Sequence, residues 1–192
     1  MPISTALFLQ WPKALTHLSI TIRRDGGPLG YAWHSMFLIH KDTLKSVYIS
    51  NRLPRGSSDD EELFPASAFP NLETLGISQW KTPRDLHFSP ADADALLGPK
   101  LKTFVWDFRI AKRGLRASSP FGEPEELWLR GLVKAVMTRN ASIRRIHIDI
   151  GNLEPDSLES PLETGYSWGA LDKMCVDFRP FGIICSYGRE PF

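Results

Sequence analysis

The sequence predicts an α/β solenoid with a curved parallel sheet of about six strands and with helices or loops on the convex side. Three observations lead to this prediction. An apolar triad with the spacing i, i+3, i+5 occurs six times in the 192 residues, and its starts are separated by 29, 28, 29, 42 and 28 residues. The second half of each triad alternates apolar and polar residues, as a strand with one buried face does. Helix and loop signals fall between the triads, and this order favours a parallel sheet.

The expected strands follow the triads, within one domain that spans residues 1–192. We expect them near residues 15–22, 44–50, 72–78, 101–108, 143–150 and 171–178. The sixth triad is the weakest match, and residues 182–186 are expected to close the end of the repeat array. The inward residues are Leu15, Leu18 and Ile20, then Leu44, Val47 and Ile49, then Leu72, Leu75 and Ile77, then Leu101, Phe104 and Trp106, then Ile143, Ile146 and Ile148, and finally Leu171, Met174 and Val176.

Helices are expected between these strands. A short one is predicted within residues 31–40. A second begins after Ser89, a good N-cap that is followed by Pro90, and it ends before residues 98–99, which are Gly and Pro. The longest is predicted over residues 124–139, with acidic residues at its start. Its apolar stripe comprises Leu127, Leu132 and Val136, with Trp128 and Met137 as further candidates.

The segments 23–30, 51–62, 111–122 and 151–165 have the Gly, Pro and charged residues of loops. One of them is basic, with Lys112, Arg113 and Arg116. Three charges are a weak signal for nucleic acid, so a solvated surface is favoured for this loop.

Composition excludes several classes. Lysine and arginine number 23 against 22 acidic residues, and the net charge of +1 gives no general attraction to nucleic acid or an anionic membrane. No apolar run approaches the roughly 20 residues that span a bilayer. Two cysteines, Cys175 and Cys185, are too few for a disulfide-rich scaffold. We therefore expect two reduced thiols, and not a disulfide bridge, in a cytoplasmic or nuclear protein.

Three segments carry a resemblance to a known family. Residues 40–49 (HKDTLKSVYI), 69–75 (FPNLETL) and 99–104 (PKLKTF) resemble the leucine-rich-repeat region of F-box-type proteins, especially the divergent ones of filamentous fungi. In that family the repeats hold a substrate protein, and a separate N-terminal F-box hands it to a ubiquitin ligase through an adaptor. The resemblance therefore implies a protein-binding module that serves ligase substrate recognition.

Two differences from this family are visible. No F-box-like helical segment precedes residue 15, so adaptor binding is expected only if an F-box lies upstream of Met1. The asparagine that many leucine-rich repeats carry eight residues after the first leucine is also missing. A second interpretation is a stand-alone structural scaffold, or a fragment, with no role in a ligase.

The strand register predicts which side chains face outward and are available to a partner protein. One outward column ends in Asp107, Asp149 and Asp177, and the acids would repel each other and favour a basic ligand segment. Local neutralisation by basic residues is the favoured alternative. Those basic residues would be Arg109, Arg145, Lys173 and Arg179. The candidate partner-binding face comprises Tyr48, Asp107, Arg145, His147, Asp149, Lys173 and Asp177.

Catalysis and cofactor binding are not expected. His147 and Cys175 would lie on adjacent strands, but no glycine-rich elbow or oxyanion hole accompanies the cysteine. No Cys or His pair has the spacing of a metal site. Trp33, Trp80 and Trp168 lie outside the inward positions, where they anchor a partner or, as favoured here, pack loops onto the repeats.

Overall fold

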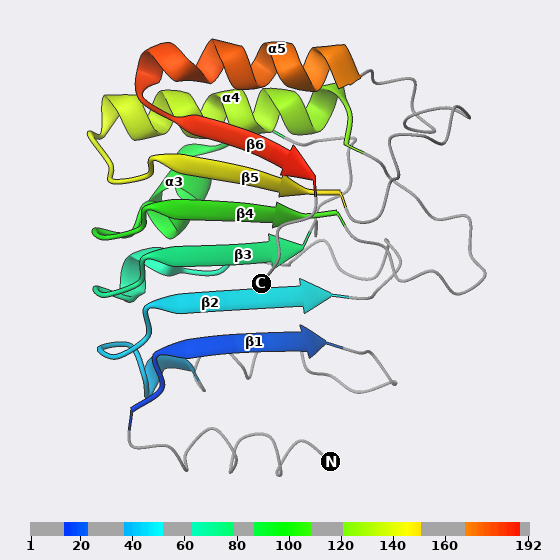
Figure 1. Ribbon diagram of the computed structural model, residues 1–192. Helices are drawn as coiled ribbons and strands as arrows, with labels where there is room; N and C mark the ends of the chain where they lie inside the picture. Colours follow the sequence, from blue (N-terminus) through cyan, green and yellow to red (C-terminus); the bar gives the residue numbers. More distant parts are fainter. Residues whose placement is uncertain are drawn as a thin grey trace, which may run out of the picture.

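Six parallel strands form one sheet in the computed structural model, which describes residues 14–22, 37–51, 63–78, 87–108, 121–150 and 168–188. Each strand pairs with the next one along the chain, so their order in the sheet is their order in the sequence (Figure 1). The strands are β1 (His17–Ile22), β2 (Ser46–Asn51), β3 (Thr74–Ser78), β4 (Thr103–Asp107), β5 (Arg145–Asp149) and β6 (Ile184–Gly188).

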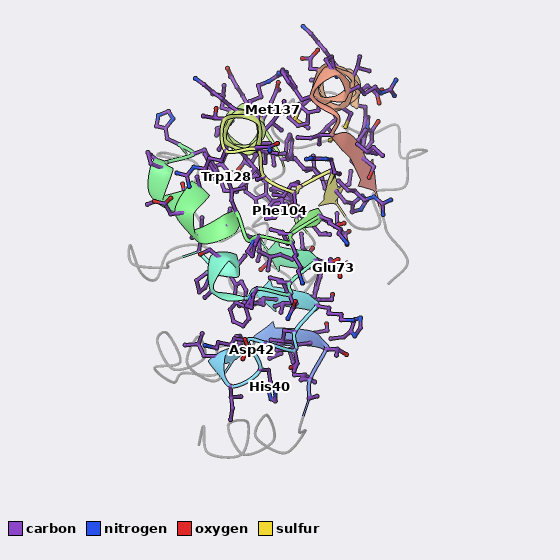
Figure 2. The ribbon with its side chains drawn as sticks, turned by 90° about the vertical axis from the view of Figure 1, so that its left-hand side faces the viewer. His40, Asp42, Glu73, Phe104, Trp128 and Met137 are labelled. Atoms are coloured by element: carbon purple, nitrogen blue, oxygen red, sulfur yellow. The ribbon has the colours of Figure 1, made fainter. Side chains whose placement is uncertain are left out.

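Three α-helices and two short 3-10 helices connect the described strands. They are η1 (Ala66–Ala68), α3 (Pro90–Leu96), α4 (Glu123–Thr138), α5 (Trp168–Phe178) and η3 (Arg179–Phe181). Helices α3 and α4 lie against one face of the sheet, and α5 lies beside α4 at the β6 end (Figures 1 and 2). The α/β class and the single parallel sheet of six strands agree with the prediction from sequence.

The first five triads occupy the inward positions predicted for them. In register, one inward column runs through Leu18, Val47, Leu75, Phe104 and Ile146, and the next through Ile20, Ile49, Ile77, Trp106 and Ile148. From β2 to β5 all of these side chains are buried. A third buried column, just before the strands, contains Leu44, Leu72, Leu101 and Ile143.

The backbone makes the same contact at the start of each strand. The carbonyl of Thr16 accepts the N–H groups of Lys45 and Ser46, at 2.8 and 3.0 Å. The carbonyls of Lys45, Glu73 and Lys102 accept the corresponding pairs from the next strand, and Arg144 accepts from Ile184. Because this contact recurs, each strand enters the sheet at the same point as its neighbour, and the apolar columns stay aligned.

An aromatic cluster joins the sheet to α4. Trp106 of β4 and Trp128 of α4 are buried, with ring centroids 4.7 Å apart. Phe104 also approaches Trp128, at 6.0 Å between centroids, and Figure 2 shows the two side chains between α4 and the sheet. Rings of this size dominate the apolar area that a core removes from water. This cluster therefore holds the longest helix against the middle of the sheet.

The predicted stripe of α4 is correct at Trp128, Leu132 and Val136, which are buried. It is wrong at Leu127 and Met137, which are 52% and 48% exposed. Leu129 and Val133 complete the apolar buried face. The prediction failed because it assigned apolar residues to the stripe without fixing the helical phase.

Both predicted helix starts are confirmed. Ser89 Oγ accepts the Asp92 N–H at 3.1 Å, Asp92 Oδ2 accepts the Ser89 N–H at 2.8 Å, and Pro90 is the first residue of α3. This is a capping box: each of the two hydrogen bonds satisfies a backbone N–H group at the helix start that has no partner within the helix. In α4, Glu125 Oε2 accepts the Gly122 N–H at 3.0 Å.

The sixth predicted strand is wrong. Residues 171–178 lie in α5, and the sixth strand is β6, which begins at Ile184. Leu171, Met174, Cys175 and Phe178 are buried along one face of α5, with the i, i+3, i+4, i+7 spacing of a helix, whereas Val176 is 51% exposed. Helical periodicity therefore outweighs the partial match to the triad.

Other predictions lie wholly or partly outside the described residues. Of the predicted helix within 31–40, residues 37–40 are described, with Phe37 buried and Ile39 59% exposed. The loop segments 23–30, 52–62, 111–120 and 151–165 lie outside, together with Trp33, Trp80 and the basic residues Lys112, Arg113 and Arg116. None of the described helices combines the length and the apolar character needed to cross a membrane.

Alanine substitutions distinguish the predicted position of the sixth strand, residues 171–178, from the observed position of β6. Ile183, just before β6, is 1% exposed, so Ile183→Ala should lower the free energy of unfolding by about 2–4 kcal/mol. Val176→Ala, on the exposed face of α5, should change it by less than about 0.5 kcal/mol. Urea denaturation followed by circular dichroism measures both. A larger loss for Val176→Ala than for Ile183→Ala would contradict the position of β6.

Candidate functional site

The sheet has a second face, opposite α3 and α4, which we call the outer face. Side chains alternate along a strand, so residues between the inward positions point to this face. In register, one outer column comprises Tyr48, Gly76, Val105, His147 and Ser186, and the next includes Ser78, Asp107, Asp149 and Gly188. An earlier column, where the strands start, comprises His17, Ser46, Thr74, Thr103, Arg145 and Ile184.

Tyr48 spans two strands on the outer face. Its hydroxyl donates a hydrogen bond to Asp107 Oδ2 of β4 at 2.5 Å, and its ring passes over Gly76 of the intervening strand β3. A Cβ atom at Gly76 would overlap the Tyr48 ring. The glycine therefore makes room for an aromatic side chain that links β2 to β4.

His147 is held between two groups of β6. Its Nε2 lies 3.2 Å from the carbonyl oxygen of Gly188, which only accepts, so Nε2 carries a proton and donates. In the neutral ring Nδ1 is then an acceptor, and Ser186 Oγ donates to it at 2.9 Å. These bonds fix the ring plane of His147 and tie β5 to β6 outside the backbone ladder.

The outer face is buried at one end and open at the other. Ser78, Asp107, His147 and Asp149, toward the carboxyl ends of the strands, are 0–4% exposed. At the other end, where the strands start, His17 and Arg145 are exposed and Ile184 is 62% exposed. The buried polar residues are thus closed to solvent, and the earlier column is the more exposed part of this face.

Five of the seven candidate residues share the outer face. Asp107, His147 and Asp149 lie in the buried polar group, and the half-buried Tyr48 is hydrogen-bonded to Asp107. Asp107 and Asp149 are register partners on adjacent strands. Arg145 lies at the open end. The predicted adjacency of these two aspartates is therefore confirmed.

Lys173 and Asp177 are not part of this face, because both belong to α5. Asp177 accepts a hydrogen bond from Arg130 of α4 at 2.8 Å, and Arg130 also pairs with Glu126 at 2.7 Å. The third acid of the predicted column is thus paired with a helix residue. Of the proposed neutralising residues, Arg179 lies in η3 and Arg109 lies outside the described residues.

Cys175 and His147 do not meet. Cys175, on α5, contacts Cys185 of β6, with 2.7 Å between the sulfur atoms. Cys185 is the register partner of the inward residue Ile146, whereas His147 points to the outer face. The sheet itself therefore separates the thiol from the imidazole. Within the described ranges, His, Cys, Asp and Glu side chains form no group of three arranged to hold a metal.

The sequence interpretation missed two residues of β6: Ser186, which is hydrogen-bonded to His147, and Tyr187, which packs against α5. Both follow Gly182, which has φ of 71° and ends η3, and both lie in the β-rich segment 183–187. That combination of a helix-ending glycine and β-branched residues is a strand signal. Trp168, at the start of α5, stacks on Tyr187 with 5.6 Å between ring centroids, so this tryptophan packs internally.

Comparison with protein-family models, with curated proteins and with solved structures finds no match to this chain.

Tyr48→Phe tests whether the hydrogen bond between Tyr48 and Asp107 stabilises the fold. The substitution keeps the ring over Gly76 but removes the donor to the buried Asp107 carboxylate, so the free energy of unfolding should fall by about 1.5–3 kcal/mol. Asp107→Asn and the double variant complete a double-mutant cycle in urea denaturation. Coupling below about 0.5 kcal/mol would show that the contact adds nothing to stability.

Tyr187 gives a prediction for alkaline pH. Burial, then the hydrogen bond to Asp172 Oδ1 and the charge of Asp172, raise the pKa of Tyr187 to about 12. A raised tyrosine pKa favours the neutral, folded form, so its stabilising contribution is complete below about pH 10 and is lost as the pH rises toward about 12. The stability difference between wild type and Tyr187→Phe should therefore shrink over that range in urea titrations. A constant difference would contradict the assignment.

Proposed function

We propose that this chain is a leucine-rich-repeat solenoid that binds another protein through the open end of its outer face. By resemblance, this would serve substrate recognition for an F-box-type ubiquitin ligase. The observation that carries the proposal is a row of side chains on six aligned strands, with α3 and α4 on the opposite face.

Regular spacing supports a solenoid. Successive strands from β1 to β4 are separated by 28 or 29 residues between register partners, as in His17, Ser46, Thr74 and Thr103. Such periods are typical of leucine-rich repeats. Side chains just before the strands also link successive turns at steps of 29 residues, since Asn71 Nδ2 donates to the Asp42 carbonyl and Lys100 Nζ donates to Asn71 Oδ1.

Charged side chains add a second link at the same edge. Lys102 Nζ lies 2.9 Å from Glu73 Oε2, and Figure 2 places Glu73 and Asp42 along this edge of the sheet. The link lowers the pKa of the Glu73 carboxyl, chiefly through the hydrogen bond with Lys102. Both side chains are more than 40% exposed, so this pair orders the edge more than it stabilises the fold.

The open row has the composition of a protein-binding surface. Small hydroxyl residues occupy its middle, at Ser46, Thr74 and Thr103, and leave room for a partner's backbone. Arg145 offers a planar charged group, and Ile184 offers apolar area at the β6 end. Arginine and large apolar side chains are frequent binding hot spots. The buried polar residues lie on the same face, nearer the carboxyl ends of the strands, where hydrogen bonds between strands support the row.

A second candidate function is a stand-alone scaffold with no ligase connection. It shares the same binding face, and it differs only in whether a ligase adaptor associates with the chain. The resemblance in residues 40–49, 69–75 and 99–104 favours the ligase interpretation, in which an F-box is encoded upstream of Met1.

Site-specific photo-cross-linking tests the binding face. A benzophenone amino acid replaces Thr103 on the open row in one variant and exposed Lys134 on α4 in the matched control, with the full chain expressed in cells. The Thr103 variant should give a discrete cross-linked partner, which Arg145→Glu in the same chain reduces by about tenfold. Equal cross-linking from Lys134, or no effect of Arg145→Glu, would show that the partner binds elsewhere.

Association with the ligase adaptor separates the two functions. The longest protein encoded by the transcript is mixed with purified adaptor and isolated on an affinity resin. Recovery of the adaptor supports ligase substrate recognition. Its complete loss, with the cross-linked partner still bound, supports the stand-alone scaffold.

A further inference from the structure

A pair of thiols lies where α5 meets β6. Cys175 of α5 and Cys185 of β6 are ten residues apart in the chain, and their sulfur atoms are 2.7 Å apart. Both are free cysteines. Cys175 is 8% exposed and Cys185 is half-buried, so the pair lies toward the rim of the core and not at its centre.

The backbone fixes the two cysteines opposite each other. Cys175 belongs to the buried stripe of α5, between Met174 and Phe178. Cys185 occupies the inward position of β6, beside Ile146 of β5. Between them the chain passes through η3 and then Gly182, whose φ of 71° suits glycine and turns the chain into β6. A disulfide needs no large rearrangement when both sulfurs already face each other.

We propose that Cys175 and Cys185 form a reversible disulfide that joins α5 to β6, with a small-molecule disulfide such as glutathione disulfide as the oxidant. The proposal does not depend on the protein-binding function, because the thiols lie on the inner side of the sheet.

The contact shifts the two thiols in opposite directions. A hydrogen bond with Cys185 lowers the pKa of Cys175, against burial and the charge of Asp172, and Arg179 also lowers it. The same contact and burial raise the pKa of Cys185. Because the thiolate is the nucleophile, the thiol that loses its proton first attacks the oxidant, and the other resolves the mixed disulfide.

The exchange balances in two steps. The thiolate of one cysteine attacks one sulfur of glutathione disulfide, the glutathione S–S bond breaks, and one glutathione thiolate leaves and takes a proton. The other cysteine then loses its proton and attacks the protein sulfur of the mixed disulfide, which releases the second glutathione. Two protein thiols are oxidised, one glutathione disulfide is reduced to two thiols, and the two protons end on glutathione.

The bond would stiffen the β6 end of the sheet. Strand β6 carries Ser186, which holds His147, and Tyr187, which packs on Trp168. A disulfide would join residues ten positions apart in the chain and reduce the conformational freedom of this segment when it is unfolded. Oxidation would thus restrain β6, the strand that carries the exposed Ile184.

The first experiment measures the bond itself. The full chain is incubated with glutathione disulfide, unreacted thiols are blocked with N-ethylmaleimide, and the intact mass is recorded. The expected product has lost two hydrogen atoms, carries no maleimide, and yields a linked peptide pair containing Cys175 and Cys185. Excess reduced glutathione should reverse it. A product with maleimide or glutathione on both cysteines, or a disulfide between two chains, would overturn the proposal.

Single serine variants test the order of attack. Each variant, Cys175→Ser or Cys185→Ser, keeps one thiol, which can form a mixed disulfide with glutathione but cannot form the internal bond. The variant that forms the mixed disulfide faster retains the attacking thiol. Release of glutathione from either variant without added thiol would contradict the two-step exchange.

A stability measurement tests the clamp. The oxidised wild type should melt about 3–8 °C above the reduced protein, and amide exchange in β6 should slow by about tenfold. The Cys175→Ser/Cys185→Ser double variant is the control and should not respond to the oxidant. A disulfide that forms without changing the melting temperature or β6 exchange would overturn the role as a clamp.

Discussion

Alignment of the strand starts is the constraint on which the rest of the structure depends. The carbonyl just before each strand from β1 to β5 accepts N–H groups at the start of the next strand, from Thr16 through Arg144. With that contact fixed, a change of one residue in register would move the apolar columns to the outer face. The Trp106 and Trp128 rings can meet only when β4 enters at its proper position. Backbone pairing and side-chain packing therefore specify the same arrangement.

The two faces of the sheet use burial differently. The inner face is apolar and packs on α4, whereas the outer face buries polar side chains that are bonded to each other across strands. A buried polar group is costly unless its hydrogen bonds are made, so each such contact also selects one geometry. The Tyr48–Asp107 bond links β2 to β4, and the His147–Ser186 bond links β5 to β6. They stabilise the sheet where the described helices do not cover it.

Much of the fold could be predicted because the triads repeat. Leu44, Leu72 and Leu101 precede the strands so regularly that five strands and their outward columns follow, and with them Tyr48, Asp107, His147 and Asp149. The last strand of the sheet could not be predicted in this way, because Leu171 and Met174 fit both a triad and a helix face. Only the spacing through Phe178 distinguishes these, and that error moved Lys173, Cys175 and Asp177 to the wrong side of the sheet. The hydrogen bonds across strands were beyond reach, since they depend on side-chain conformations that spacing does not encode.

Gly76 has a consequence for how such chains can diverge. The Tyr48 ring occupies the volume that a side chain at position 76 would need, so the sizes of these two residues are not independent. An ancestor or descendant with alanine or serine at position 76 would have to carry a small residue at position 48, and the hydrogen bond with position 107 would be lost with the ring. Substitutions at these three sites should consequently accumulate as a set, with position 48 becoming small before position 76 gains a side chain.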